Sequence, residues 1–193
     1  MSNISQLKQQ CRLDLSAQRQ QLSPAQRQHH SQRIFEHSQD YLKGVPQPME
    51  LLIYRALAAE VDTSFFFNAG FTHIYAPRML PQSGLTWVRV QHDTIWQKVD
   101  FGVLEPTSGE IWQKNKLKTL MICPLLGFDR LGNRLGMGKG YFDRWLEHHA
   151  NEVDQQLGLA FSLQELPKVP TEPHDAPLST IITEREVITC LNH

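Results

Sequence analysis

The chain has 193 residues, of which 40% are hydrophobic and 20% are charged, the balance of an ordinary globular protein long enough to bury a core. Its 19 Lys and Arg residues against 20 Asp and Glu residues leave a formal net charge of -1, which excludes recruitment of nucleic acid by a global positive field. Three separated cysteines (Cys11, Cys123 and Cys190) without a CxxC pair, and no apolar run near the ~18 residues of a membrane span, predict a cytoplasmic protein without a membrane or nucleic-acid partner.

The first expected element is a helix over residues 4–20, because apolar residues recur there at three- and four-residue spacing. Its expected buried face consists of Ile4, Leu7, Cys11 and Leu15. After a break, Ser23 is a suitable N-cap and Pro24 stands at the first helical position. Gln26 completes a capping-box pattern, so a second helix is expected to run to about Leu42.

Three basic residues form a single stripe on the first helix. On a helical wheel, Lys8, Arg12 and Arg19 fall within about 40° of one another and border the expected apolar face. One interpretation is a solvated edge, in which the long side chains cover apolar surface and keep their charges in water. The alternative is an arm that brings two cations to a phosphate site.

The rest of the chain alternates short apolar runs with helical segments, which predicts an α/β fold with a mostly parallel sheet. The expected strands cover residues 50–54, 72–76, 85–90, 119–123, 156–161 and 178–183. Helices are expected after Asp62, with Gly70 as the C-cap, and from Tyr141 to about Asn151. The segment 91–118 is expected to be an ordered loop because it carries two tryptophans, and its elements are not assigned.

The most informative stretch is "DRLGNRLGMGKGYFDRWL", residues 129–146, which follows the expected strand 119–123. Ligands bind at the carboxyl ends of strands in open α/β sheets. The connection from Pro124 to Gly140 is much longer than the ~4–6 residues usual for a compact domain, which favours a functional loop. Its alternating glycines, Gly136, Gly138 and Gly140, would let backbone N–H groups converge on an anion at the start of the next helix.

Arg134 and Lys139 supply the positive charge that such an anion needs, and a phosphate is the natural candidate. Neither named nucleotide motif is complete: Asn133 and Gly140 break the P-loop pattern, and Tyr141 replaces the third glycine of GxGxxG. The competing interpretation is a flexible surface turn with solvated cations. The strand before the loop and the helix after it favour the phosphate site.

Three acidic residues have both a structural and a functional interpretation. Asp143, in the first turn of the last expected helix, could complement the helix dipole or hold Mg²⁺ beside a polyphosphate. Asp175 stands in a proline-bounded loop, where an exposed turn aspartate is the simpler explanation. Glu60, taken alone, is a loop glutamate. The nine histidines show no ligand spacing that predicts a structural zinc site.

Four segments together resemble the 5-formyltetrahydrofolate cyclo-ligase family, also called 5,10-methenyltetrahydrofolate synthetases. They are the K-x-x-x-R of Lys8 and Arg12, the Y-x-x-x-x-x-E-V-D-T ending at Thr63, "PLLGFDRLGNRLGMGKGYFDRWL" and "HDAPLSTIIT". The resemblance implies an α/β fold, a three-layer α/β/α sandwich with a mixed sheet related to phosphosugar isomerases and CoA transferases, with an N-terminal helical arm. It implies one domain over residues 1–193, with the helices of residues 1–42 packed on the core.

The resemblance also implies the ATP- and Mg²⁺-dependent closure of 5-formyltetrahydrofolate to 5,10-methenyltetrahydrofolate, with release of ADP and phosphate. The γ-phosphoryl group would pass to the formyl oxygen before N10 attacks the activated carbon. Two other activities remain open: a kinase of another small metabolite, and a sensor that binds a phosphate ligand without turnover. Product spectroscopy distinguishes the kinase from the cyclo-ligase, and the sensor would bind nucleotide without turnover. We expect a monomer that takes a reduced folate.

The implied ATP contacts come from the N-terminal arm and the glycine-rich loop. They are Lys8, Arg12, Arg134, Leu135, Gly136, Met137, Gly138, Lys139, Gly140, Tyr141 and Phe142. Arg134 and Lys139 would act in catalysis by offsetting the charge of the phosphates. Asp143 and Asp175 would be the magnesium ligands.

On the folate side the resemblance implies contacts from Glu60 and Arg55, and from Met137 and Tyr141 of the same loop. Two positions depart from the family pattern. Met137 stands where many relatives have an arginine or an aromatic residue, and Phe142 replaces the second tyrosine of "GYYD". The missing phenol removes one hydrogen-bonding group from the loop.

Overall fold

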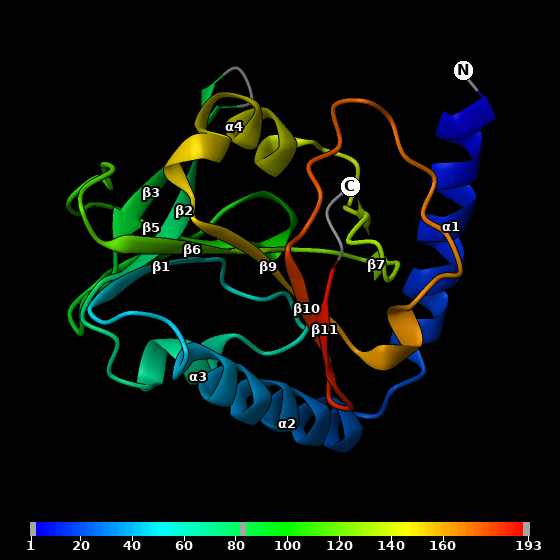
Figure 1. Cartoon of the computed structure of the whole chain (residues 1–193), viewed down its shortest axis with the longest axis horizontal. Coiled ribbons are helices and arrows are strands. Elements are labelled where there is room, and N and C mark those ends of the chain that lie inside the picture. The colour runs from blue at the N-terminus through cyan, green and yellow to red at the C-terminus, as the bar shows by residue number, and fades with distance from the viewer. Residues whose placement is uncertain (1–2, 82–83, 191–193) are drawn as a thin grey trace.

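The computed structural model describes residues 3–81 and 84–190, and its centre is a seven-stranded mixed sheet (Figure 1). The strands of this sheet are β1 (Met49–Ile53), β2 (Ile74–Leu80), β3 (Gly84–Arg89), β6 (Lys118–Cys123), β9 (Gln155–Leu159), β10 (Thr180–Ile182) and β11 (Val187–Thr189). Their spatial order is β11-β10-β9-β6-β1-β2-β3. The five inner strands are parallel, and the edge strands β3 and β11 run antiparallel to their neighbours.

The described residues form four α-helices: α1 (Asn3–Gln20), α2 (Pro24–Leu42), α3 (Ser64–Asn68) and α4 (Tyr141–His149). Figure 1 shows α2 and α3 on one face of the sheet and α4 on the other, which gives the three-layer α/β/α arrangement. The central strand β1 is buried along its whole length, as expected for a parallel strand covered on both faces. The predicted α/β fold with a mostly parallel sheet is therefore confirmed.

The second predicted helix begins where its capping pattern indicates. The Ser23 hydroxyl accepts a hydrogen bond from the Gln26 N–H at 3.2 Å, and the Gln26 side chain accepts one from the Ser23 N–H at 2.9 Å. Ile34, in the middle of α2, is fully buried in the core beneath the sheet. A local sequence signal thus fixes the start of the helix that covers this face.

Short elements lie outside the main sheet. The segment expected to be an ordered loop holds the hairpin of β4 (Trp96–Lys98) and β5 (Leu104–Pro106), with the 3₁₀ turn η2 (Asp100–Gly102) between them. The long connection after β6 holds a second hairpin, β7 (Gly127–Phe128) and β8 (Arg134–Leu135). Two further 3₁₀ turns of the described residues are η3 (Ala150–Glu152) and η4 (Ser162–Gln164). Strands of two or three residues are too short to show a period in the sequence.

The expected buried face of α1 is wrong for the first half of the helix. Leu15 is buried, but Ile4 and Leu7 are 39% and 50% exposed. Lys8 and Arg19 are only 6% and 5% exposed, so the solvated-edge interpretation does not hold for these two cations. The reason is that Lys8 faces a loop that carries carboxylates and not an apolar layer.

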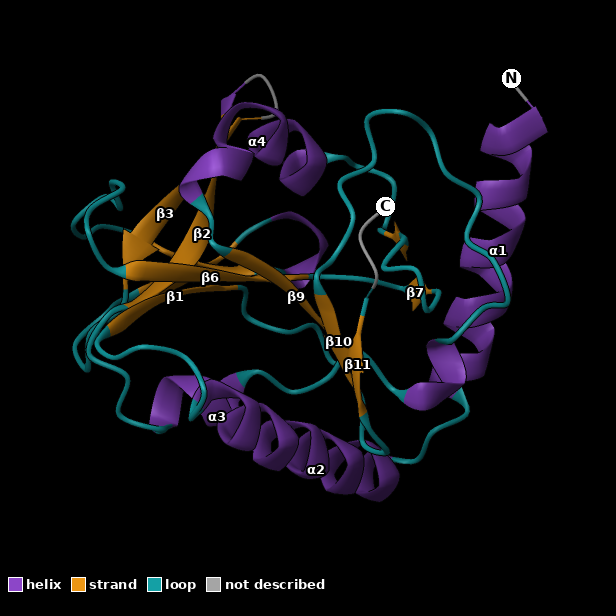
Figure 2. Cartoon of the chain, in the orientation of Figure 1, coloured by secondary structure: helices purple, strands orange, loops and turns teal. Residues whose placement is uncertain are grey.

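Helix α1 stands beside loops more than beside the sheet. Figure 2 shows that the chain between α1 and the sheet is mostly loop, together with β7. The segment that leads to β10 runs along α1 in the same view, in agreement with the contact between Lys8 and Asp175. Within residues 3–81 and 84–190, no helix combines the length and the apolar character needed to cross a membrane.

Candidate active site

The two halves of the predicted site begin at the carboxyl ends of neighbouring parallel strands. In the register of β1 and β6, Ile53 pairs with Ile122, so Tyr54 and Cys123 lie at the same edge of the sheet. Burial raises the pKa of the Cys123 thiol to about 11, and burial raises the pKa of the Tyr54 phenol well above 10. Both groups are therefore neutral at pH 7. Glu60 follows the first strand and the glycine-rich loop follows the second.

Asp129 anchors the first part of the glycine-rich loop. Its carboxylate is 1% exposed and accepts hydrogen bonds from the backbone N–H groups of Leu131, Asn133 and Val169 at 2.9–3.1 Å. The Asn133 side chain donates to the same carboxylate. These hydrogen bonds fix the β7–β8 hairpin, and the hairpin positions Arg134, the first residue of β8, in the site. Asp129 was not predicted as a site residue, although an acidic residue at the start of a turn is a recognisable signal.

Arg134 and Asp143 form a pair between the loop and the first turn of α4. Arg134 Nη2 lies 2.5 Å from Asp143 Oδ1, and their side chains are 3% and 22% exposed. Arg134 Nε is buried without a partner in the described chain, so the guanidinium has donor capacity to spare. The charges of the pair act in opposite directions on the pKa of the Cys123 thiol: Arg134 lowers it and Asp143 raises it.

Arg12 of α1 closes over the glycines of the loop. Its Nε donates to the carbonyl oxygen of Gly136 at 2.9 Å. Gly138 has a positive φ of 91°, and a Cβ there would lie 3.2 Å from Cζ of Arg12. Glycine is therefore needed both for the backbone conformation and for the approach of the guanidinium. The side chain of Met137 is 53% exposed at the outer edge of this loop.

The loop ends at the N-terminus of α4, where Gly140 adopts the left-handed conformation with φ 67°. No described side chain caps this end of the helix, so the N–H groups of its first turn are available to an anion. Tyr141 lies under the guanidinium of Arg144, 5.3 Å from ring centroid to Cζ. Phe142 points into the core and contacts Trp87 edge to face, so it can serve a nucleotide only through its backbone.

Lys8 joins the arm to the loop before β10. Its Nζ lies 2.5 Å from Asp175 Oδ2 and 2.8 Å from Glu172 Oε2. Although burial lowers the pKa of Lys8, the hydrogen bonds to these two carboxylates raise it above the ordinary value. Lys8 and Arg12 are one helical turn apart on α1. The loop before β10, which holds Glu172 and Asp175, and the glycine-rich loop therefore contact the same face of α1.

The two predicted magnesium ligands each face a cation. Asp143 pairs with Arg134, and Asp175 pairs with Lys8. Among the described residues, the candidate group of three metal ligands is Glu172, His174 and Asp175, whose ligand atoms lie within 4.8 Å of one another. Carboxylate oxygens are the ligands Mg²⁺ prefers, so Asp175 has suitable neighbours. Asp143 is not a member of this group.

Glu60 borders a hollow of about 440 Å³ between α2 and the loop after β1. The hollow is lined by Pro24, Arg27, Gln28, Ser31, Ala56, Leu57, Ala58, Glu60, Asp62 and Phe65. Oε2 of Glu60 accepts a hydrogen bond from the Leu57 N–H at 2.8 Å. Burial raises the pKa of the Glu60 carboxyl, and the Leu57 N–H and the charge of Arg19 lower it in part. The volume is in the range of sites for small organic ligands.

Arg55 lies beside two aromatic rings and not in the lining of that hollow. Its Cζ lies 5.0 Å from the ring centroid of Phe67 and 4.9 Å from that of Trp96. The two rings contact each other edge to face, so the guanidinium is held by cation–π contacts from α3 and β4. Trp96 was not predicted as a site residue. A tryptophan in a segment without an assigned element was the available signal.

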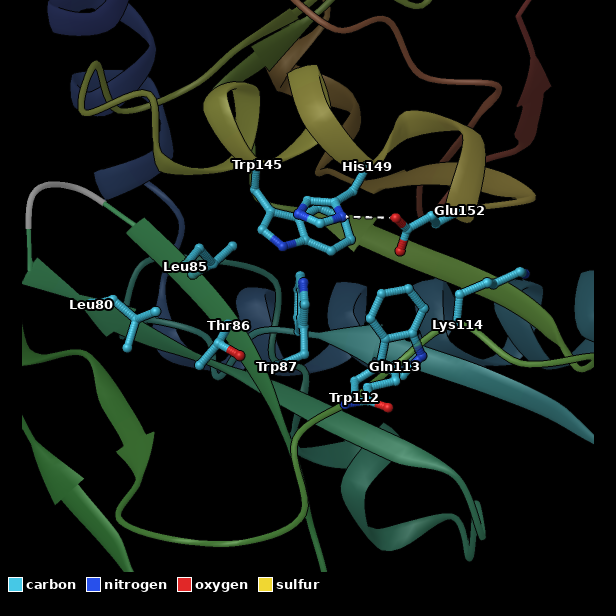
Figure 3. A pocket seen from close by; sticks show the side chains of 10 residues that line it. All are labelled: Leu80, Leu85, Thr86, Trp87, Trp112, Gln113, Lys114, Trp145, His149 and Glu152. Atoms are coloured by element: carbon cyan, nitrogen blue, oxygen red, sulfur yellow. Dashed lines mark hydrogen bonds and ion pairs between the residues drawn. The ribbon is translucent and has the colours of Figure 1, made fainter.

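A second hollow, of about 310 Å³, lies between α4 and β3 and is shown in Figure 3. Its lining residues are Leu80, Leu85, Thr86, Trp87, Trp112, Gln113, Lys114, Trp145, His149 and Glu152. Trp145 and His149 stack with their ring centroids 4.6 Å apart, and His149 contacts Glu152 at 3.1 Å. None of the predicted site residues lines this hollow.

Comparison with known proteins decides the family. A model described as the 5-formyltetrahydrofolate cyclo-ligase family matches residues 4–184. The chain belongs to this cyclo-ligase family. The match covers the glycine-rich loop, both carboxylates proposed for Mg²⁺ and every other residue of the predicted site. The resemblance inferred from the motifs is confirmed.

Relatives within the cyclo-ligase family span almost the whole chain. The 5-formyltetrahydrofolate cyclo-ligase of Haemophilus influenzae is 29% identical over 92% of this chain and 98% of its own length. The mouse (Mus musculus) protein of the same name is 27% identical over 80% of both chains.

Solved structures agree with this assignment. The 5,10-methenyltetrahydrofolate synthetase of Aquifex aeolicus superposes with a TM-score of 0.79 at 26% identity, covering 97% of this chain and 94% of that one. The synthetase of Mycoplasma pneumoniae, at 23% identity and a TM-score of 0.72, covers 92% of this chain and 98% of its own and supports the fold. The cyclo-ligase family and the observed three-layer architecture are thus consistent.

Proposed function

We propose that this chain closes 5-formyltetrahydrofolate to 5,10-methenyltetrahydrofolate while ATP is converted to ADP and phosphate. The observation that carries the proposal is a family match over residues 4–184 that coincides with two half-sites at one edge of the sheet. One half is the glycine-rich loop after β6, and the other is the Glu60 hollow after β1.

The glycine-rich loop is the proposed phosphate site. The uncapped N-terminus of α4 supplies backbone donors and the positive end of the helix dipole. Arg12, Arg134 and Lys139 supply charge around the same backbone. ATP carries several negative charges, so both the backbone N–H groups and the basic side chains are needed to hold it in a partly buried site. Met137 and Tyr141 would border the reduced folate at the exposed side of the loop.

The carboxylates of Asp143 and Asp175 fit the metal that a nucleoside triphosphate needs. Mg²⁺ usually binds through one or two protein carboxylates together with phosphate oxygens and water. When bound it offsets charge on the transferred phosphoryl group. Lys8 and Arg134, which contact these carboxylates, carry the positive charge that phosphate oxygens require.

The proposed reaction has two steps. The formyl oxygen attacks the γ-phosphorus of ATP, the bond from that phosphorus to the bridging oxygen breaks, and ADP leaves. N10 of the folate then attacks the formyl carbon and loses its proton, the carbon–oxygen bond breaks, and phosphate departs. The product shares one positive charge between N5 and N10. The residues contribute positioning and charge neutralisation, and we assign the latter to Arg134 and Lys139.

The folate would enter the hollow beside Glu60. A buried carboxylate there can accept hydrogen bonds from the N–H groups of a pterin ring. Arg55, beside Phe67 and Trp96, follows the same strand β1 as Glu60 and would carry positive charge near the substrate.

The test is incubation of the protein with 5-formyltetrahydrofolate, ATP and Mg²⁺, with methenyl absorbance and ADP measured together. We expect equal amounts of both products, and neither product when ATP or Mg²⁺ is omitted. ADP without methenyl product would indicate a kinase of another metabolite. Nucleotide binding without either product would indicate a non-catalytic protein.

A further inference from the structure

Lys8 of α1 contacts two carboxylates, and the proposed function uses only one of them. Its Nζ lies 2.5 Å from Oδ2 of Asp175 and 2.8 Å from Oε2 of Glu172. The Lys8 side chain is 8% exposed, so water can do little to replace either partner of this ammonium group. The metal, phosphate and folate contacts of the proposed function do not include Glu172.

A short turn fixes the two carboxylates relative to each other. The Glu172 N–H donates to Asp175 Oδ2 at 2.7 Å, and the Asp175 N–H donates to the Glu172 carbonyl oxygen at 3.0 Å. Pro173 restricts the backbone between them. Both contacts use backbone atoms of Glu172, so a change of its side chain alone does not remove them.

The charges of the three side chains do not cancel, because one ammonium group faces two carboxylates. Oδ1 of Asp175 accepts no hydrogen bond from residues 3–81 and 84–190, and His174 Nε2 stands 3.9 Å from it. Asp175 can therefore offer Oδ1 to Mg²⁺ while Oδ2 keeps its backbone donor. Once its charge serves the metal, Asp175 is a weaker partner for Lys8, and Glu172 is already in contact with that ammonium group.

The alternative role for Glu172 is that of a metal ligand, together with His174 and Asp175, since the ligand atoms of these three residues lie within 4.8 Å of one another. Lys8 Nζ, however, contacts the same oxygens of Glu172 and Asp175 that would hold such a metal. A metal bound between these two oxygens would have to expel Lys8, the cation that the proposed function assigns to phosphate.

Resting on the proposed function, we propose that Glu172 is a positioning residue that supplies the counter-charge of Lys8 when Asp175 binds Mg²⁺. An ammonium group has three N–H donors, so Lys8 can donate to Glu172 and to phosphate oxygens at the same time. Glu172 thereby holds Lys8 in place and leaves the charge of Asp175 to the metal. Without the Glu172 carboxylate, Lys8 and Mg²⁺ compete for Asp175, and the metal is bound more weakly.

The test measures how much Mg²⁺ strengthens ATP binding, without folate and therefore without ring closure. Dissociation constants for ATP are determined by isothermal titration calorimetry in Mg²⁺ and in EDTA, and their ratio is the gain in affinity due to the metal. Glu172→Gln should lower this gain about tenfold, because Lys8 then competes with Mg²⁺ for Asp175. ATP affinity in EDTA should not fall, because no phosphate contact is removed.

Lys8→Met shows whether Glu172 acts through Lys8. In this background no ammonium group competes for Asp175, so adding Glu172→Gln should change the gain by no more than about threefold. Should Lys8→Met fail to fold, Lys8→Gln takes its place. The matched control is Glu165→Gln, because the side chains of Glu165 and Glu172 are both 33% exposed and Glu165 pairs with Arg130. It should change ATP affinity neither in Mg²⁺ nor in EDTA.

An unchanged gain in Glu172→Gln would overturn the role of Glu172, and so would an equal loss of ATP affinity in Mg²⁺ and in EDTA, which indicates structural damage. A tenfold loss of the gain that persists in the Lys8→Met background would make Glu172 a metal ligand and not a positioning residue. A wild-type protein whose ATP affinity does not respond to Mg²⁺ would contradict the proposed function itself, and the role of Glu172 with it.

Discussion

Lys8 and Arg134 neutralise the two carboxylates that we assign to Mg²⁺. Each cation lies 2.5 Å from its carboxylate, Lys8 from Asp175 and Arg134 from Asp143. Both cations are almost fully buried, so each pair also holds a loop in place. Replacing either aspartate therefore has two consequences, a loss of the proposed metal ligand and a buried cation left without its partner.

The first prediction concerns Asp143→Asn and Asp175→Asn. If both residues serve one metal beside the ATP phosphates, each change should lower kcat by about 100-fold or more, because charge neutralisation of the phosphoryl group is lost. The double variant should be little worse than the poorer single variant, since both changes remove one shared interaction. The measurement is kcat as a function of Mg²⁺ concentration for the four proteins.

The matched control is Asp40→Asn, because Asp40 is exposed and pairs with Lys43 at the C-terminal end of α2. It should leave kcat and the Mg²⁺ requirement unchanged. If Asp143 only complemented the helix dipole, its variant would show near-normal turnover at saturating Mg²⁺ and effects that add to those of Asp175→Asn. Either finding would remove Asp143 from the metal site.

At the scale of elements, the connection between β6 and α4 has two parts with different tasks. The β7–β8 hairpin is fixed by the Asp129 carboxylate and positions Arg134. The glycines that follow leave the backbone open to Arg12 and to a ligand. Rigidity in the first part and close approach in the second together give a preorganised anion site.

The second prediction is that Gly138→Ala impairs ATP binding more than it impairs folding. The positive φ of 91° costs about 1–2 kcal/mol for alanine, and the new Cβ would press on Arg12. The apparent KM for ATP should rise by about tenfold, measured with folate saturating. Gly136→Ala is the comparison, because a Cβ there meets only an ordinary contact at 3.6 Å with Arg134. Equal effects of the two changes would argue against the contact with Arg12.

The third prediction concerns Asp154, which ties the amino ends of β6 and β9 together. Its carboxylate accepts from Lys118 at 2.6 Å, from Lys114 at 3.0 Å and from the Thr119 N–H at 2.9 Å. Burial raises the pKa of Asp154, but these hydrogen bonds outweigh burial and lower it to about 2. Because this is below the value of about 3.9 for an unfolded chain, the stabilisation is complete above pH ~4 and is lost as the pH falls toward 2.

Asp154→Asn should therefore lower the free energy of unfolding by about 1–2 kcal/mol at pH 6. The difference from wild type should shrink as the pH falls below about 4, as followed by denaturant unfolding at a series of pH values. Asp40→Asn again serves as the control at an exposed pair. A difference that is the same at pH 6 and pH 3 would contradict the electrostatic origin.

At the scale of the whole molecule, the site depends on three parts of the chain that are distant in sequence. The parallel pair β1 and β6 provides the shared edge, the arm α1 lies across the loops, and the segment before β10 returns to the arm (Figure 1). A mostly parallel sheet gives this arrangement directly, because all its inner strands end at one side.

Much of this architecture could be predicted, since the signals are local. The capping box at Ser23, the apolar strands and the glycine-rich loop each require only neighbouring residues. The exposure of Leu7 and the burial of Lys8 could not be predicted, because they depend on which segment packs against α1. The pairing of Arg55 with Trp96 likewise joins segments that no local pattern connects.

The sequence predicts residues of the candidate site, but it does not predict which of them contact one another. The resemblance indicated Asp143 and Asp175, whereas their contacts with Arg134 and Lys8 appear only in the folded chain. Arg19 was recognised as part of a cationic stripe, yet its burial depends on the tertiary structure. Composition and period carry no information about such long-range partners.

The most direct test of the central claim follows the oxygen atom of the formyl group. The protein is supplied with 5-formyltetrahydrofolate labelled with ¹⁸O in the formyl group, together with ATP and Mg²⁺, and the released phosphate is analysed by mass spectrometry. If the formyl oxygen attacks the γ-phosphorus before ring closure, each phosphate released with a methenyl product should carry one ¹⁸O atom. Methenyl product accompanied by unlabelled phosphate, with the label found in water, would contradict the phosphorylated intermediate.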